Sequence, residues 1–203
     1  MQSTVHLYNV ALARLGGEQL PRNISSQESD AVGVLCDNLF PQVLDLTLTA
    51  HAWSFALKRV FLAAVPENGP GNALYRLAYA VPSDCVKAVR LAGGGVNRSP
   101  AYVMEGETLR TNERQAVLVY VARVTDPQKW PPAFADALAW ALAGELASAR
   151  LNDSRKQNWC YQNYKVALGD AIARDRATQN PYAPVSPWQA ARFGTMNPET
   201  GRK

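Results

Sequence analysis

The spacing of apolar residues changes twice along this 203-residue chain, and the two changes restrict the folds open to it. Up to Trp53 the apolar side chains recur every three or four residues, which is typical of amphipathic helices. From Trp53 to Val124 they alternate with polar residues, which is typical of strands. After Pro131 and Pro132 the helical spacing returns. Because helices and strands form separate blocks, the pattern predicts an α+β fold and not alternating βαβ units.

Two helices are predicted before the β block. The first runs from Val5 to Leu15, with Ser3 or Thr4 as its N-cap and Gly16-Gly17 at its end. The second follows a polar link and keeps its spacing from Val32 to Trp53, about six turns. Pro41 lies inside this second pattern, so we expect a kink or break near residues 37–40.

The β block divides into short strands separated by turn sequences. Pro82-Ser83-Asp84 ends one strand, Gly93-Gly94-Gly95 forms a loose turn, and Glu105-Gly106-Glu107 predicts a hairpin. The predicted strands are residues 53–61, 75–81, 85–91, 101–104, 108–110 and 117–124.

Two more helices are predicted after the β block. Eight of the 17 residues 133–149 are alanine, which lets neighbouring helices approach closely. The last helix is capped by a residue among 152–154 and ends near Ala177. Its predicted apolar stripe is Tyr161, Tyr164, Leu168 and Ile172. The simplest arrangement is one discontinuous four-helix bundle, residues 1–52 and 125–178, with a β-rich antiparallel insertion at residues 53–124.

The segment 179–203 has four prolines and no periodicity, yet it contains Tyr182, Trp188 and Phe193. Large aromatic residues are unusual in a solvated tail. We therefore expect an extended arm that docks on another surface, with a tail that wraps its own domain as the alternative. Arg98, beside the glycine run, is a candidate basic tip at an interface.

The charge of the chain is unevenly distributed. Net charge is +4, and residues 150–203 hold nine Lys or Arg and four Asp or Glu, which is +5. Such a basic third suits nucleic acid or an acidic protein surface, and also a solvated helix face with a basic tail. No helix-turn-helix spacing or zinc finger accompanies it. A nucleic-acid-binding accessory protein is the alternative function.

The residues that carry chemistry form no recognisable catalytic set. Cys36, Cys85 and Cys160 lie far apart, which predicts neither a zinc site nor a disulfide framework but thiols in a reducing compartment. Cys85 with His51 or His6 as base matches no cysteine-enzyme signature. We expect no enzyme activity, no cofactor and no metal.

No membrane-spanning segment is predicted. The most apolar helical window, residues 133–149, carries Asp136 and Glu145. The first residues lack the basic and apolar regions of a signal peptide. We expect a soluble intracellular product without a membrane partner.

Four motifs of this chain follow one another in an order and with a spacing similar to those of a known family. They are Leu15-Gly16-Gly17, Ala52-Trp53-Ser54-Phe55-Ala56, Tyr79-x-Val81-Pro82-Ser83-Asp84-Cys85, and Tyr120-x-Ala122-x-Val124 continuing through Pro131-Pro132 and Phe134 into residues 135–146. Over residues 3–178 the chain resembles the tail tubular protein A family of short-tailed bacteriophages, the head-to-tail adaptors beneath the portal. Pro41 and the Pro-rich arm depart from the family pattern.

The resemblance implies a structural role in the virion neck, after assembly in the host cytoplasm. Members form a twelve-subunit ring that joins the portal protein to the tail nozzle protein and continues the channel for DNA, which passes without sequence-specific binding. A ring subunit covers several faces with neighbours, which agrees with a charged fraction of only 19%. We expect the helices to contact neighbouring subunits and the portal, and the β insertion to face the distal tail. We expect the arm to bind the portal or an adjacent subunit through Trp188 and Phe193.

Overall fold

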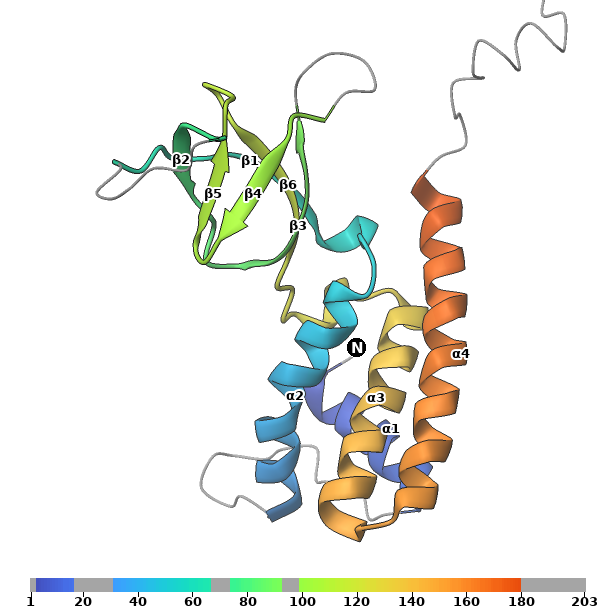
Figure 1. Cartoon of the computed structure of the whole chain (residues 1–203). Coiled ribbons are helices and arrows are strands. Elements are labelled where there is room, and N and C mark those ends of the chain that lie inside the picture. Colours follow the sequence, from blue (N-terminus) through green and yellow to red (C-terminus); the bar gives the residue numbers. More distant parts are fainter. Residues whose placement is uncertain (1–2, 17–30, 67–73, 93–98, 180–203) are drawn as a thin grey trace, which may run out of the picture.

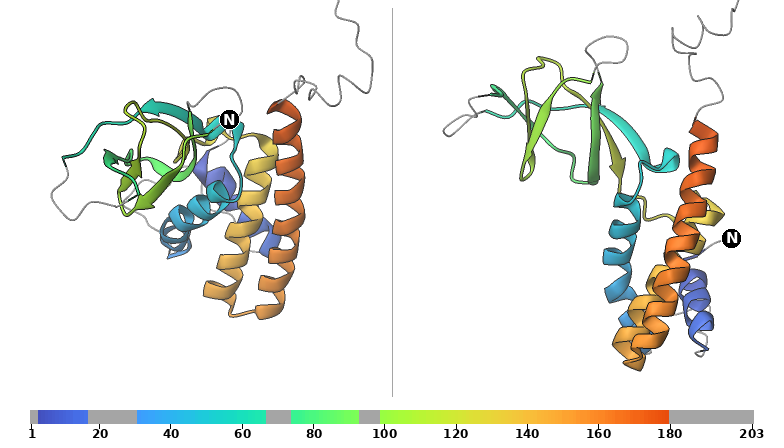
Figure 2. Two further views of the ribbon diagram at one scale, coloured as in Figure 1. Left: turned by 45° about the horizontal axis from the view of Figure 1, so that its top comes forward. Right: turned by 45° about the vertical axis from the view of Figure 1, so that its right-hand side comes forward.

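The structure, a computed structural model, describes residues 3–16, 31–66, 74–92 and 99–179 (Figure 1). Within these residues the chain has a mixed α+β fold with four α-helices and two small antiparallel sheets. The helices gather at one end of the molecule and the sheets at the other (Figures 1 and 2). The predicted α+β class is therefore confirmed.

The first two helices agree with the sequence pattern in place but not in every detail. Helix α1, Thr4–Leu15, begins where Ser3 Oγ accepts from the backbone N–H of His6 at 3.1 Å and ends at Gly16, whose φ is 73°. Helix α2, Ala31–Thr49, runs without a break through Pro41, so the predicted kink or break is not a break. Pro41 and Asp37 lie on the exposed side of α2, where a carbonyl that loses its helical partner can bond to water.

The junction between α2 and the first strand differs from the prediction. The helix ends at Thr49, not at Trp53, and the strand begins at Leu57, after a 3₁₀ turn over Ser54–Ala56. The indole of Trp53 donates to the carbonyl of Thr47 at 3.0 Å, and its side chain is 1% exposed. Trp53 therefore serves as a buried anchor of the junction and not as a sheet residue.

Six strands form two three-stranded sheets. The first has the order β1-β6-β3, from Leu57–Phe61, Val117–Ala122 and Cys85–Ala92. The second has the order β2-β5-β4, from Leu77–Ala80, Thr108–Thr111 and Tyr102–Glu105. The predicted hairpin is confirmed, because Glu105 pairs with Thr108 around Gly106, whose φ of 62° suits glycine.

Helix α3, Pro132–Leu151, is the central helix and packs against α1, α2 and α4. Its small residues permit close approach, since a Cβ added at Gly144 would lie 3.6 Å from the Cβ of Cys160. Helix α4, Ser154–Gln179, packs mainly on α3 (Figure 1). Among the described helices, α4 is thus the least covered by the rest of the chain.

Two hydrophobic clusters form the core. The larger one joins all four helices to Trp53, Trp130 and Val121. The smaller one lies in the β part and is centred on Leu109, Leu118 and neighbouring residues. In the described part of the chain only α2 is long and apolar enough to cross a membrane, a test that the core helix of a soluble protein also passes.

Candidate interaction surface

A groove of about 350 Å³ lies between α2 and α4, with α3 as its floor. In Figure 1 these two helices flank α3. The groove exists because α4 packs on α3 and leaves α2 uncovered along this side. Its lining residues are Val43, Leu46, Thr47, Trp140, Ala141, Gly144, Glu145, Gln157, Asn158, Tyr161 and Tyr164.

Large apolar side chains at this groove point partly into solvent. Leu46 on α2 is 59% exposed and Tyr161 on α4 is 51% exposed. Tyr161 belongs to the predicted apolar stripe of α4, of which Leu168 and Ile172 pack against the large cluster while Tyr161 stays exposed; the most deeply buried apolar residues of α4 are Cys160 and Ala171. The correction follows from packing: α4 contacts one helix, so only a narrow side of it is covered.

A second apolar patch lies on another side of α4. Trp159 is 51% exposed and Val166 is 74% exposed, and their spacing of seven residues puts them on the same side of the helix. The Trp159 ring meets Trp140 edge to face, with centroids 5.1 Å apart. Helix α4 therefore exposes apolar side chains on two different sides.

Cations lie close to two aromatic rings that line the groove between α2 and α4. Lys165 Nζ is 4.4 Å from the ring centroid of Tyr161, and the guanidinium of Arg14 is 4.0 Å from that of Trp140. Arg14 also binds the carboxylate of Asp136. Burial lowers the pKa of Arg14, while Asp136 opposes that shift. Contacts of this kind hold the aromatic rings in place without adding a reactive group.

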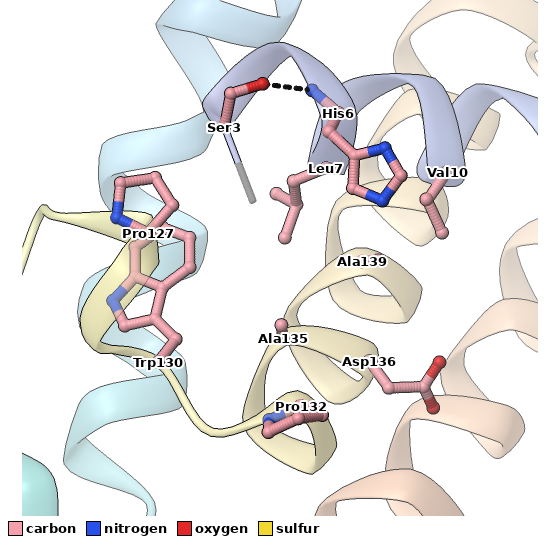
Figure 3. Close-up of a pocket in the computed structure, with 10 residues that line it drawn as sticks. All are labelled: Ser3, His6, Leu7, Val10, Pro127, Trp130, Pro132, Ala135, Asp136 and Ala139. Carbon is pink, nitrogen blue, oxygen red and sulfur yellow. Dashed lines mark hydrogen bonds between the residues drawn. The ribbon is translucent and has the colours of Figure 1, made fainter. Parts of the chain in front are cut away.

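A smaller groove of about 170 Å³ lies between α1 and the start of α3 (Figure 3). Leu7, Val10, Trp130 and alanines of α3 form its apolar walls, and His6 and Asp136 lie at its edge. The indole of Trp130 already donates to the carbonyl of Val124 at 2.8 Å. The walls of this groove therefore suit van der Waals contact with an apolar partner and present no catalytic set of side chains.

Asp175 ties the end of α4 to the junction between α2 and the sheets. Asp175 is 7% exposed, and its carboxylate accepts hydrogen bonds from the backbone N–H of Ser54 at 3.1 Å and from Ser54 Oγ at 2.5 Å. His51 Nε2 lies 3.1 Å from the same carboxylate. The contacts join residues more than 120 positions apart, so Asp175 fixes α4 relative to the start of the β part.

The titratable groups considered for catalysis lie in structural positions. His51 is held by Asp175. Burial raises the pKa of the Cys85 thiol, which opposes formation of a thiolate. Cys36, Cys85 and Cys160 are free thiols. Across the described ranges no group of three His, Cys, Asp or Glu side chains could hold a metal ion.

The interface residues predicted from the sequence, Tyr182, Trp188, Phe193 and Arg98, all lie outside the described residues. Sequence reasoning did not identify Leu46, Tyr161 or Val166 as surface residues, although Leu46 and Tyr161 belong to the predicted apolar spacing of their helices. Apolar spacing marks all such positions alike, and only the packing shows which of them stay uncovered. The chain matches no protein-family model and no curated protein.

Proposed function

We propose that this chain is a ring subunit of a head-to-tail adaptor in a short-tailed bacteriophage, joining the portal to the tail nozzle. In this proposal the helices act as one four-helix bundle, the β part is a module inserted between α2 and α3, and the C-terminal segment is an extended arm. The order of helices and strands agrees with the resemblance that suggests the adaptor role. The channel would carry DNA without sequence-specific binding.

The observation that best supports assembly is the uncovered apolar groove between α2 and α4. A closed ring needs two different faces on each subunit, because each contact is heterologous. The groove with Leu46 and Tyr161 supplies one face, and the Trp159 and Val166 side of α4 supplies another. We assign the contact between neighbouring subunits to these two faces. Tyr182, Trp188, Phe193 and Arg98 remain predicted further contacts with a neighbour or the portal.

Two matched variants on α2 test the groove. Leu46 and Val34 are both exposed apolar residues of this helix, at 59% and 43%, but only Leu46 lines the groove. Each is replaced by lysine and co-expressed with the portal protein encoded in the same genome. A charge buried without a partner costs about 3 kcal/mol, so Leu46→Lys should reduce adaptor recovered with the portal by about 100-fold.

The Val34→Lys variant should be recovered at the wild-type ratio of adaptor to portal. Equal recovery of both variants would remove the groove from the assembly contact. Thermal unfolding of each isolated variant shows whether the substitution acts on folding instead, because an exposed substitution should leave stability within about 0.5 kcal/mol.

A further inference from the structure

The sheet β1-β6-β3 carries four charged side chains, and all four are cations: Lys58, Arg59, Lys87 and Arg90. Two of them are engaged. Lys58 Nζ lies 2.6 Å from the carboxylate of Asp84, and Lys87 Nζ donates to the carbonyl of Thr49 at 2.8 Å. Within the described ranges, Arg59 and Arg90 make neither an ion pair nor a side-chain hydrogen bond, and both are exposed.

The strand register brings these two arginines together. Arg59 on β1 and Arg90 on β3 are both paired with Val119 on the middle strand. Directly opposite residues of an antiparallel pair point to the same face, so the two side chains flank Val119 on one face. Two strand spacings of about 4.8 Å put their backbones about 10 Å apart.

This face is separate from the β core. Leu118 and Tyr120, the neighbours of Val119 on β6, belong to the smaller hydrophobic cluster and therefore lie on the opposite face. Val119 belongs to neither cluster, yet it is only 6% exposed. The aliphatic stems of the flanking arginines suit this apolar position and leave the guanidinium groups toward solvent.

An exposed aromatic ring completes the face. Phe61 is 75% exposed and lies two residues after Arg59 on β1, so it shares the face of the two arginines. Among the described residues, the carboxylates nearest to Arg59 and Arg90 along the chain are bound elsewhere: Asp45 by Arg123, and Asp84 by Lys58 and Tyr120. The arginine face, defined by Arg59, Arg90 and Phe61, is thus cationic with one aromatic platform.

We propose that the arginine face binds the phosphate backbone of nucleic acid. A guanidinium group matches phosphate with two parallel hydrogen bonds, and two of them at this spacing suit a ligand with repeated anionic groups. The exposed phenyl ring adds a surface on which an unpaired base stacks. The carboxylates of an acidic protein would pair with the two arginines but would not stack on the Phe61 ring. The inference concerns the isolated chain and does not depend on ring formation.

The test uses the full chain and two fluorescent oligonucleotides of equal length, one single-stranded and one duplex, with anisotropy as the readout. The variant is Arg59→Gln with Arg90→Gln. The control is Arg150→Gln with Arg155→Gln, two exposed arginines at the α3–α4 turn that change net charge by the same amount. Loss of two charge-assisted contacts should weaken binding by about tenfold or more, while the control stays near wild type.

Salt titration gives a second readout. Each phosphate contact contributes about 0.9 to the slope of log K against log salt for a duplex and about 0.7 for a single strand, so the sheet variant should lower the slope by about 1.4 to 1.8. A Phe61→Ala variant then identifies the ligand. Weaker binding of the single strand alone shows that Phe61 stacks on an unpaired base, and unchanged binding of both limits the contact to the phosphate backbone that the two oligonucleotides share.

The proposal is overturned if the sheet variant binds both oligonucleotides as wild type does, or if the control variant loses as much affinity. Recovery of the sheet variant with the portal is measured in parallel. A sheet variant that loses oligonucleotide binding but is still recovered with the portal separates this inference from the adaptor proposal. If the adaptor proposal fails, oligonucleotide binding is unaffected; if this inference fails, recovery with the portal is unaffected.

Discussion

The helical end and the sheet end of the molecule are stabilised by different means. The helices surround α3, whose buried side chains are apolar, and the large cluster contains Leu138, Leu142 and Leu146 without exposure. The sheets enclose a smaller cluster and add polar contacts, such as Asp84 accepting from Tyr120 Oη at 2.9 Å. The comparison shows which kind of side chain each end leaves exposed: apolar side chains on α2 and α4, and, on the β1-β6-β3 sheet, Arg59 and Arg90, which have no partner among the described residues.

The largest expected effect comes from the same deletion in both cores. Leu142→Ala on α3 and Leu109→Ala on β5 each remove a leucine side chain that is fully buried. Leu142 is surrounded by packed helices that cannot collapse, so its loss should lower the free energy of unfolding by about 4–5 kcal/mol. The smaller β cluster relaxes more easily, and Leu109→Ala should cost about 2–3 kcal/mol. Urea denaturation followed by far-UV circular dichroism measures both. A larger cost for Leu109→Ala would reverse the comparison.

The next effect tests the connection between the two ends. Asp175→Asn removes a buried carboxylate that accepts hydrogen bonds from Ser54, and should cost about 2–3 kcal/mol. Asp170→Asn is the control, because Asp170 lies on the same helix and binds Arg174 at the surface. A surface pair contributes less than about 1 kcal/mol. Equal stability of the two variants in urea would show that Asp175 does not hold α4 to the junction.

The smallest effect concerns acid stability of the sheet end. The hydrogen bond from Lys58 lowers the pKa of Asp84 below its usual value of 3.8, with Tyr120 acting in the same direction. Because the folded-state pKa is the lower one, this stabilisation is present above pH 3.8 and is lost as the pH falls below it. Asp84→Asn should therefore flatten the fall in stability below pH 4. Unfolding midpoints from pH 2.5 to 6 measure it, and a slope equal to that of wild type would refute the role.

The order of helices and strands could be predicted because apolar spacing is local. Ser3, Gly16 and the Gly106 hairpin act within a few residues, so their roles follow from the sequence. The first strand begins at Leu57 and not at the predicted Trp53, because Ser54 is held by Asp175, 121 positions away, and such a contact cannot be predicted from local spacing.

The candidate surfaces could not be predicted in the same way. Arg59 and Arg90 lie 31 positions apart, and only the strand register places them opposite the same valine. Leu46 follows the same helical spacing as the buried Val43, and only the absence of α4 along that side leaves it exposed. Both cases depend on which segments meet, which a local pattern does not contain.

The most direct test of the adaptor proposal is negative-stain imaging of the particle purified after co-expression with the portal protein from the same genome. The proposal predicts a second ring stacked coaxially on the portal ring, and a monomeric state of the free chain is compatible with it. Portal rings without a second ring, at both low and moderate salt, would contradict it.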